Sequence, residues 1–232
     1  MGRVDEYRAE LRALTRSTWQ PYLAKHSGLP GPRGNIELAQ AVAEEADPEF
    51  LDALIATGDE YLVFCGVVGL GRLLAEGAGR EVERRLHAHA RDERWRVREA
   101  VAMALQRLGD RDVRRLLDVV SEWADDADPL VQRAAAAGVC EPRLLSTPEA
   151  ATAALGVCDR ITRRLADRPA GERRDPGVRA LRKCLGYCWS VAVAAIPDRG
   201  LPAFRALSEC SDPDLVWIVR ENSKKARLAR LL

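Results

Sequence analysis

Several features that mark large classes of proteins are missing from this chain of 232 residues. No apolar run is long enough to span a membrane, and the chain does not open with a charged segment followed by an apolar one, so we expect neither a transmembrane helix nor a targeting segment. The chain has only three histidines, and its six cysteines form no CxxC pair, so we expect no metal site, no disulfide framework and no cofactor. These absences predict a cytoplasmic protein whose cysteines are small buried side chains.

The alternating pattern of β-strands is also missing, and glycine, proline and aspartate separate segments with helical periodicity. We therefore predict an all-α protein. Five segments begin alike, with aspartate or proline, a short gap and a residue that starts an apolar helix. Their valines recur at the interval expected for pairs of helices, which predicts helix pairs stacked into a right-handed α-solenoid. These valines are Val63, Val97, Val131, Val178 and Val216.

We expect one domain over residues 1–232 and a monomer, because no Gly/Ser linker divides the chain. Residues 1–35 are predicted to form an irregular N-terminal helix and loop, and residues 36–232 the helical repeats. The longest interval, between Val131 and Val178, covers an inserted basic loop within residues 160–175, whose charge serves either function or solubility.

Charge is divided unevenly along the chain, although the net charge is only +1. Residues 160–232 contain 16 Lys and Arg against 8 Asp and Glu, so the segment 1–159 carries a net charge of −7. A basic C-terminal third is typical of a protein that binds a polyanion or an acidic partner surface. Charge alone also fits an arginine-rich chain with solvated helix faces.

Some side chains are predicted to point away from the apolar stripes of their helices. In the segment 93–108, Trp95 and Glu99 each lie two residues from Val97, which belongs to the buried stripe. Because they are four residues apart, they are neighbours on the exposed side. The same periodicity turns three further side chains away from the core: Arg133, Lys183 and Tyr187. Equivalent faces of a solenoid align, so we expect these residues to share one concave groove.

The segments that carry these residues resemble the alkylpurine DNA glycosylase family, which is built from HEAT-like repeats and acts in DNA alkylation repair. The resemblance covers residues 90–225 and rests on the segments ERWRVRE (93–99), WADDADPLVQR (123–133) and LRKCLGY (181–187). By position, Trp95 matches a tryptophan of the family and Arg133 an arginine. Glu99 stands where the family has its catalytic aspartate, and Tyr187 where it has a second tryptophan.

This resemblance implies a HEAT-like repeat protein that binds duplex DNA and hydrolyses the N-glycosidic bond of alkylated purines. Glu99 would be the catalytic carboxylate, which stabilises the positive charge that builds up on the sugar and orients a water. Trp95 and Tyr187 would contact the cationic base or the sugar, and Arg133 and Lys183 would bind the DNA backbone.

The last helix adds further cations. We expect Arg220 and Lys224 to contact the DNA backbone, with Lys225, Arg227 and Arg230 nearby. The same helix also fits the polar cap that a solenoid needs at its end.

A second hypothesis is a non-catalytic HEAT-repeat scaffold that binds a protein partner in the same groove. The two departures from the family pattern and the acidic segment 1–159 favour it. In this case Trp95 packs against a neighbouring helix and Glu99 pairs with Arg96 or Arg98. A cluster of carboxylates in one turn is predicted to cap helices rather than to act in catalysis: Asp125, Asp126 and Asp128.

Overall fold

Every regular element of the computed structural model, which describes residues 2–232, is a helix, and the predicted all-α class is confirmed. The chain divides into two compact units, Met1–Leu108 and Gly109–Leu232. The single domain over residues 1–232 and the hand of the repeat stack stay predictions. Within the described part, no helix has both the length and the apolar character needed to cross a lipid bilayer.

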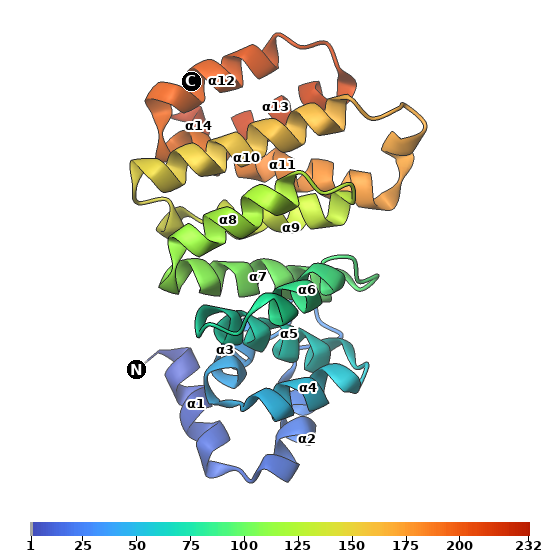
Figure 1. Cartoon of the computed structure of the whole chain (residues 1–232), viewed down its shortest axis with the longest axis vertical. Coiled ribbons are helices and arrows are strands. Elements are labelled where there is room, and N and C mark those ends of the chain that lie inside the picture. The colour runs from blue at the N-terminus through green and yellow to red at the C-terminus, as the bar shows by residue number, and fades with distance from the viewer. Residues whose placement is uncertain (1) are drawn as a thin grey trace. The chain divides into compact units, whose positions relative to one another are not determined.

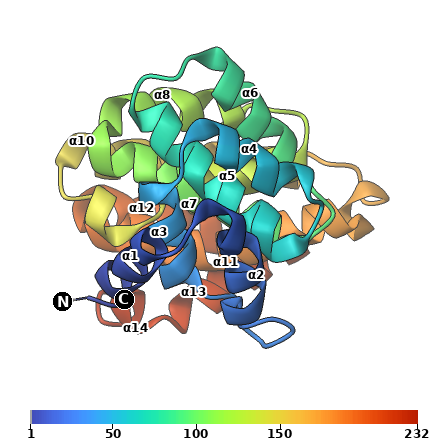
Figure 2. The same cartoon turned by 90° about the horizontal axis from the view of Figure 1, so that it is seen from below.

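The first unit is built around one buried helix, α5 (Glu60–Ala75), in which 12 of 16 residues are buried. Its neighbours are α1 (Arg3–Ala13), α2 (Arg16–His26), α3 (Ile36–Glu45), α4 (Pro48–Ala56) and α6 (Arg80–His89), and α7 (Trp95–Arg111) begins in this unit. The helices α2, α3, α4 and α6 pack on α5, and α1 packs on α3 (Figures 1 and 2). In the first unit, therefore, α5 is the central helix and the other helices surround it.

The N-terminal region contains one helix more than the sequence predicted. Residues 1–35 were expected to form one helix and a loop, whereas α1 ends at Ala13 and a second helix, α2, follows it. Trp19 anchors α2 in the core, where it is 3% exposed and donates a hydrogen bond from Nε1 to the Leu11 carbonyl at 3.0 Å. The loop that follows leads into α3, as predicted, because the Asn35 side chain accepts the Leu38 N–H at 3.0 Å.

The second unit has two helical layers. Its elements are α8 (Val113–Ala124), α9 (Pro129–Val139), η1 (Pro142–Leu144), α10 (Pro148–Ala166), η2 (Glu172–Arg174), α11 (Pro176–Ala195), α12 (Pro197–Ser208), α13 (Pro213–Ser223) and α14 (Ala226–Ala229). The helices α8, α10 and α12 pack in one series, and α9, α11 and α13 pack in the other. Each helix of the first series also packs on its successor in the second, as Figure 1 shows for α10 and α11. We call the second series the α9–α11–α13 layer.

In the last repeat the valine of the recurring pattern is not the buried residue. Val216 is 51% exposed, and Leu215 takes the buried position at 5% exposure. Asp212 caps α13, and Leu215 is the third residue after this cap. Val178, which stands three positions after the cap Asp175, is buried in the same way.

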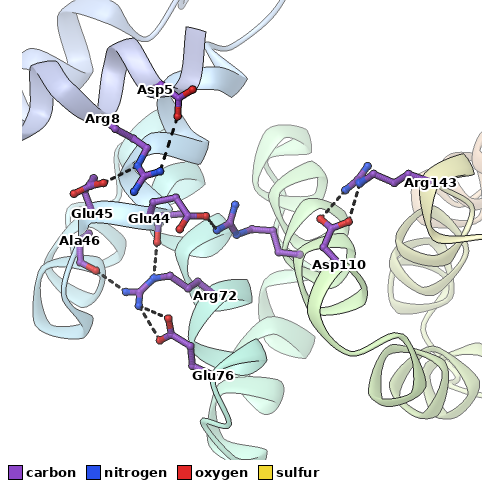
Figure 3. A network of polar contacts seen from close by, with 11 residues as sticks. Asp5, Arg8, Glu44, Glu45, Ala46, Arg72, Glu76, Asp110 and Arg143 are labelled. Carbon is purple, nitrogen blue, oxygen red and sulfur yellow. Dashed lines mark hydrogen bonds and ion pairs between the residues drawn. The ribbon is translucent and has the colours of Figure 1, made fainter. Parts of the chain in front are cut away.

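Arginines gather at the C-terminal end of α3 (Figure 3). Arg8 and Arg12 of α1 each bind Glu45 at 2.6 Å, and Arg72 of α5 donates a hydrogen bond to the Ala46 carbonyl at 2.6 Å. The last carbonyls of a helix have no partner inside the helix and carry a partial negative charge, and Arg72 supplies such a partner, whereas Arg8 and Arg12 bind a carboxylate at the same helix end. The contacts therefore fasten α1 and α5 to the end of α3.

The Glu45 carboxyl makes this network sensitive to pH. The hydrogen bond from Arg12 lowers the pKa of Glu45 below its ordinary value of about 4.3. A group whose pKa is lowered in the folded state contributes stability above its unfolded pKa and loses it as the pH falls through the folded pKa. We expect Glu45→Gln to be less stable than the wild type near pH 7 and to lose less further stability below about pH 4.3.

Urea unfolding midpoints from about pH 7 to pH 3 measure this effect. The matched control is Glu49→Gln, because Glu49 is exposed and forms no ion pair within residues 2–232. A Glu45→Gln curve that runs parallel to the wild-type curve at all pH values contradicts the prediction.

Candidate functional site

Five helices, among them those that carry the predicted residues, are preceded by the same aspartate contact, in which the carboxylate accepts the backbone N–H two residues further along. Before α5, α9, α11 and α13 the aspartate caps the helix and satisfies a donor at its start. Asp92 lies three residues before α7, and its contact is part of the turn that leads into this helix. The five contacts are Asp59 to Tyr61 (2.9 Å), Asp92 to Arg94 (2.9 Å), Asp128 to Leu130 (2.8 Å), Asp175 to Gly177 (2.7 Å) and Asp212 to Asp214 (2.9 Å).

In the first unit, Trp95 and Glu99 lie in the first two turns of α7. Trp95 is 49% exposed and Glu99 is partly buried, whereas Val97 and Val101 between and after them are fully buried. Helical periodicity thus places the indole and the carboxylate off the buried stripe. Arg96, between them, donates a hydrogen bond to the Gly31 carbonyl at 2.9 Å, so the loop between α2 and α3 borders this part of α7.

The start of α7 is held by an ion pair that sequence reasoning missed. Arg94 binds Asp92 through two hydrogen bonds of 2.8 and 2.7 Å and reaches the Gly58 carbonyl at 2.7 Å. The hydrogen bond from Arg94 lowers the pKa of Asp92. Because Gly58 ends the turn before α5, these contacts fasten the first turn of α7 to that turn.

In the second unit, Arg133 of α9 and the residues of α11 lie close together. The Cys184 thiol on α11 lies 3.7 Å from the Arg133 carbonyl, and the Cys188 thiol lies 3.6 Å from the Ala136 carbonyl. Arg133 is partly buried, and Tyr187, which lies on the same face of α11 as Cys184, is 42% exposed. Lys183 is exposed one turn before Tyr187.

The aromatic ring of Tyr187 contacts the C-terminal segment. Arg227 donates a hydrogen bond to the phenol oxygen at 2.8 Å, and its guanidinium carbon lies 5.0 Å from the ring centroid. The Lys225 ammonium lies 5.7 Å from the same centroid. The sequence predicted these two cations only near the DNA-backbone contacts of Arg220 and Lys224, and it gave no sign of their contact with Tyr187.

The two cations predicted on the last helix, Arg220 of α13 and Lys224 directly after it, have an acidic neighbour. The exposed side chains of Lys224 and Arg220 lie 2.7 and 3.5 Å from the carboxylate of Glu221. The hydrogen bond from Lys224 lowers the pKa of Glu221, which stays charged and partly neutralises both cations.

Trp217 of α13 packs where α11 has a glycine. A Cβ atom at Gly186 would lie 2.7 Å from the Trp217 ring, which is closer than such atoms approach. On its other side, the guanidinium carbon of Arg182 lies 4.7 Å from the centroid of the Trp217 ring. Arg182 also binds Asp214 at 2.6 Å. These contacts join α11 to α13.

The basic loop within residues 160–175 is bound back onto the protein. Arg173 lies 2.5 Å from Asp212, the cap of α13, and Arg168 donates a hydrogen bond to the Ala127 carbonyl at 2.9 Å. These arginines therefore hold the loop in place. In the turn before α9, Asp128 caps the helix as predicted, and Asp126 accepts the Asp128 N–H at 2.7 Å. Asp125 instead forms an ion pair with Arg160 at 2.8 Å.

The cysteines match the expectation of small buried side chains in most cases. Cys65, Cys140, Cys158 and Cys188 are buried, and Cys184 and Cys210 are partly exposed. Burial raises the pKa of Cys65 above its usual range. Within residues 2–232, no group of three His, Cys, Asp or Glu side chains has a geometry that could hold a metal ion.

The predicted site residues fall in two separate groups. Trp95 and Glu99 belong to the first unit, and the remaining residues belong to the second. Their convergence on one groove and their individual roles stay predictions. A surface hollow of about 830 Å³ in the second unit lies elsewhere, at the starts of α10 and α12, and is lined by residues such as Thr147, Thr152 and Arg199.

Comparison with known proteins identifies the fold. No family model matches the chain, and no curated protein does. The crystal structure of AlkD2 from Streptococcus mutans is similar, with a TM-score of 0.65 and 18% identity, covering 90% of this chain and 98% of that chain. Two engineered proteins each reach a TM-score of 0.41 at 17% identity; one match covers 100% of this chain and 98% of that chain, the other 96% and 97%. The likeness to AlkD2 shows that the fold is an all-α arrangement of HEAT-like repeats.

The close contact between Gly186 and Trp217 gives a prediction about stability. We expect Gly186→Ala to destabilise the protein by about 1–3 kcal/mol, because the added methyl group has to displace the indole from a packed position. The measurement is the free energy of unfolding from urea titration. Gly156→Ala on α10 is the matched control, because nothing lies within 4 Å of its added Cβ. It should gain about 0.5–1 kcal/mol from helix propensity. Equal effects of the two substitutions contradict this packing.

Proposed function

We propose that the protein binds duplex DNA and acts in DNA alkylation repair. The observation that carries the proposal is the exposure of Trp95, with 49% of its surface accessible at the start of α7 and Glu99 one turn further on. Three other tryptophans, Trp19, Trp123 and Trp189, are at most 3% exposed. An aromatic face off the core suits stacking on a base or contact with a cation. Trp95 stands where the resemblance to the alkylpurine DNA glycosylase family places such a contact, and the likeness of the fold to AlkD2 supports it.

Electrostatics support a polyanionic partner. Lys183 is exposed on α11, and it forms no ion pair with a carboxylate in the part of the chain that the structure describes. A lysine without a neutralising carboxylate suits a phosphate, whose counterions are released when the lysine binds. Arg133, on the adjacent helix α9, is proposed to bind the same strand.

The proposed chemistry is hydrolysis of the N-glycosidic bond of an alkylated purine. The oxygen of a water bonds to the sugar carbon, the bond from this carbon to the base nitrogen breaks, and its electron pair leaves with the base and neutralises the positive charge that alkylation gave it. Glu99 would stabilise the positive charge on the sugar and take the proton of the water. Its carboxylate lies one methylene further from the backbone than that of an aspartate, so hydrolysis and binding are tested separately.

Salt dependence tests the binding. We expect log K for a labelled duplex to fall linearly with log salt, and Lys183→Gln to weaken binding and to lower the slope by about 0.9. Fluorescence anisotropy measures both values. Arg205→Gln is the matched control. Arg205 is an exposed cation of α12, which does not belong to the α9–α11–α13 layer, so its substitution should leave the slope unchanged. Binding of the wild type that is absent or independent of salt overturns the proposal and favours the protein-binding scaffold.

Release of methylated purines from alkylated duplex DNA tests the hydrolysis. We expect the wild type to release them, and Glu99→Gln to lower the rate by about 100-fold or more, because a single charge-stabilising group at a reacting centre contributes that much. Glu93→Gln is the control, because Glu93 is exposed just before α7. A wild-type rate equal to that of Glu99→Gln removes the enzymatic part of the proposal and leaves a DNA-binding protein.

A further inference from the structure

The C-terminal segment brings two cations to the exposed side of Tyr187. Lys225 precedes α14 and Arg227 lies within it, and α14 packs on α11, which carries Tyr187. The guanidinium carbon of Arg227 lies 5.0 Å from the ring centroid and the Lys225 nitrogen 5.7 Å from it. Both distances are within the range of a cation–π interaction. Tyr187 therefore holds two positive charges beside α11.

In the part of the chain that the structure describes, Lys225 and Arg227 lack the carboxylate neighbour that Arg220 and Lys224 have. Arg220 and Lys224 lie next to Glu221. Within residues 2–232, neither Lys225 nor Arg227 forms an ion pair with a carboxylate. Lys183 adds a third cation without such a pair, and it lies one helical turn from Tyr187 on the same face. An uncompensated positive charge thus gathers around Tyr187.

Arg227 keeps most of its hydrogen-bonding capacity. A guanidinium has five N–H donors, and in the described part of the chain the side chain of Arg227 donates one hydrogen bond, to the phenol oxygen of Tyr187. This hydrogen bond and the ring hold the planar fork in place. A fixed guanidinium fork matches two oxygens of a phosphate.

The same geometry argues against base stacking on Tyr187. A base that alkylation has made cationic would have to approach a ring that already has two cations beside it. Like charges at this separation repel, whereas an anion is attracted. The surroundings of Tyr187 therefore suit a phosphate and do not suit the base or sugar contact that the sequence predicted.

We propose that Arg227 and Lys225 form a phosphodiester subsite in which Tyr187 is a positioning residue. The ligand is a backbone phosphate of the DNA strand, with Lys183 as a third cation beside it. This inference rests on the proposed function, and it replaces the predicted contact of Tyr187 with the base by a contact of its two cations with the backbone.

Chemical footprinting tests the subsite residue by residue. Phenylglyoxal modifies arginines, and mass spectrometry reports the extent of modification at Arg227 and at Arg205, which is exposed on α12 and serves as the internal control. The wild-type protein is treated alone, with a duplex oligonucleotide and with inorganic tripolyphosphate. We expect both ligands to slow the modification of Arg227 several-fold and to leave Arg205 nearly unchanged.

The outcomes separate this inference from the proposed function. Protection of Arg227 by tripolyphosphate alone supports the phosphate subsite and overturns the binding of DNA. No protection by either ligand, or equal protection of Arg227 and Arg205, overturns the subsite even where duplex DNA binds elsewhere.

Substitutions test the role of Tyr187. We expect Arg227→Gln to lower the salt slope of DNA binding by about 0.9, and Arg205→Gln to leave it unchanged. Tyr187→Ala should weaken the binding of alkylated and unmodified duplexes by the same factor, and Tyr187→Phe, which keeps the ring, should restore part of that loss. A Tyr187→Ala defect confined to the alkylated duplex overturns the positioning role and restores a contact with the base.

Discussion

The arrangement depends on one repeated hydrogen bond, in which an aspartate carboxylate accepts the backbone N–H two residues further along. It recurs before α5, α7, α9, α11 and α13 at distances between 2.7 and 2.9 Å. Before α5, α9, α11 and α13 the aspartate is the residue that caps the helix, so the helical period then decides which side chains enter the core. Tyr187 and Val216 lie off the core in helices that begin in this way, whereas Trp95 is the first residue of α7 and lies three residues after Asp92.

Local signals in the sequence were sufficient for most of the fold. Aspartate and proline mark where the helices begin, and apolar periodicity identifies their buried faces. The errors arose where the signal was not local. Helix α2 has Pro21 inside it and is held by the burial of Trp19 against α1, which periodicity does not reveal. At α13 the valine spacing pointed to Val216, whereas the cap Asp212 places Leu215 inside.

The candidate site was predictable to the same extent. Helical geometry within one segment was enough to expect Trp95 and Tyr187 off the core, because the relevant neighbours lie three or four residues away. The contact between Tyr187 and Arg227 joins residues 40 positions apart, and no periodicity carries that information. The pairing of Arg220 and Lys224 with Glu221 could have been predicted from the sequence, because an acidic residue one and three positions from two basic residues forms short-range ion pairs.

Binding and hydrolysis place different demands on the residues where this chain departs from the family pattern. A phosphate contact acts over a screening length of about 8 Å, so a cation displaced by an ångström still contributes. A carboxylate that stabilises charge on a sugar has to lie within about 0.5 Å of its working position. The change from aspartate to Glu99 shifts the carboxylate by about one C–C bond, roughly 1.5 Å, and so bears on hydrolysis alone. The change from tryptophan to Tyr187 adds a hydroxyl that accepts a hydrogen bond from Arg227. The first departure weakens the case for hydrolysis, and the second strengthens the case for a contact with the DNA backbone, so the proposed binding of DNA does not depend on the proposed hydrolysis.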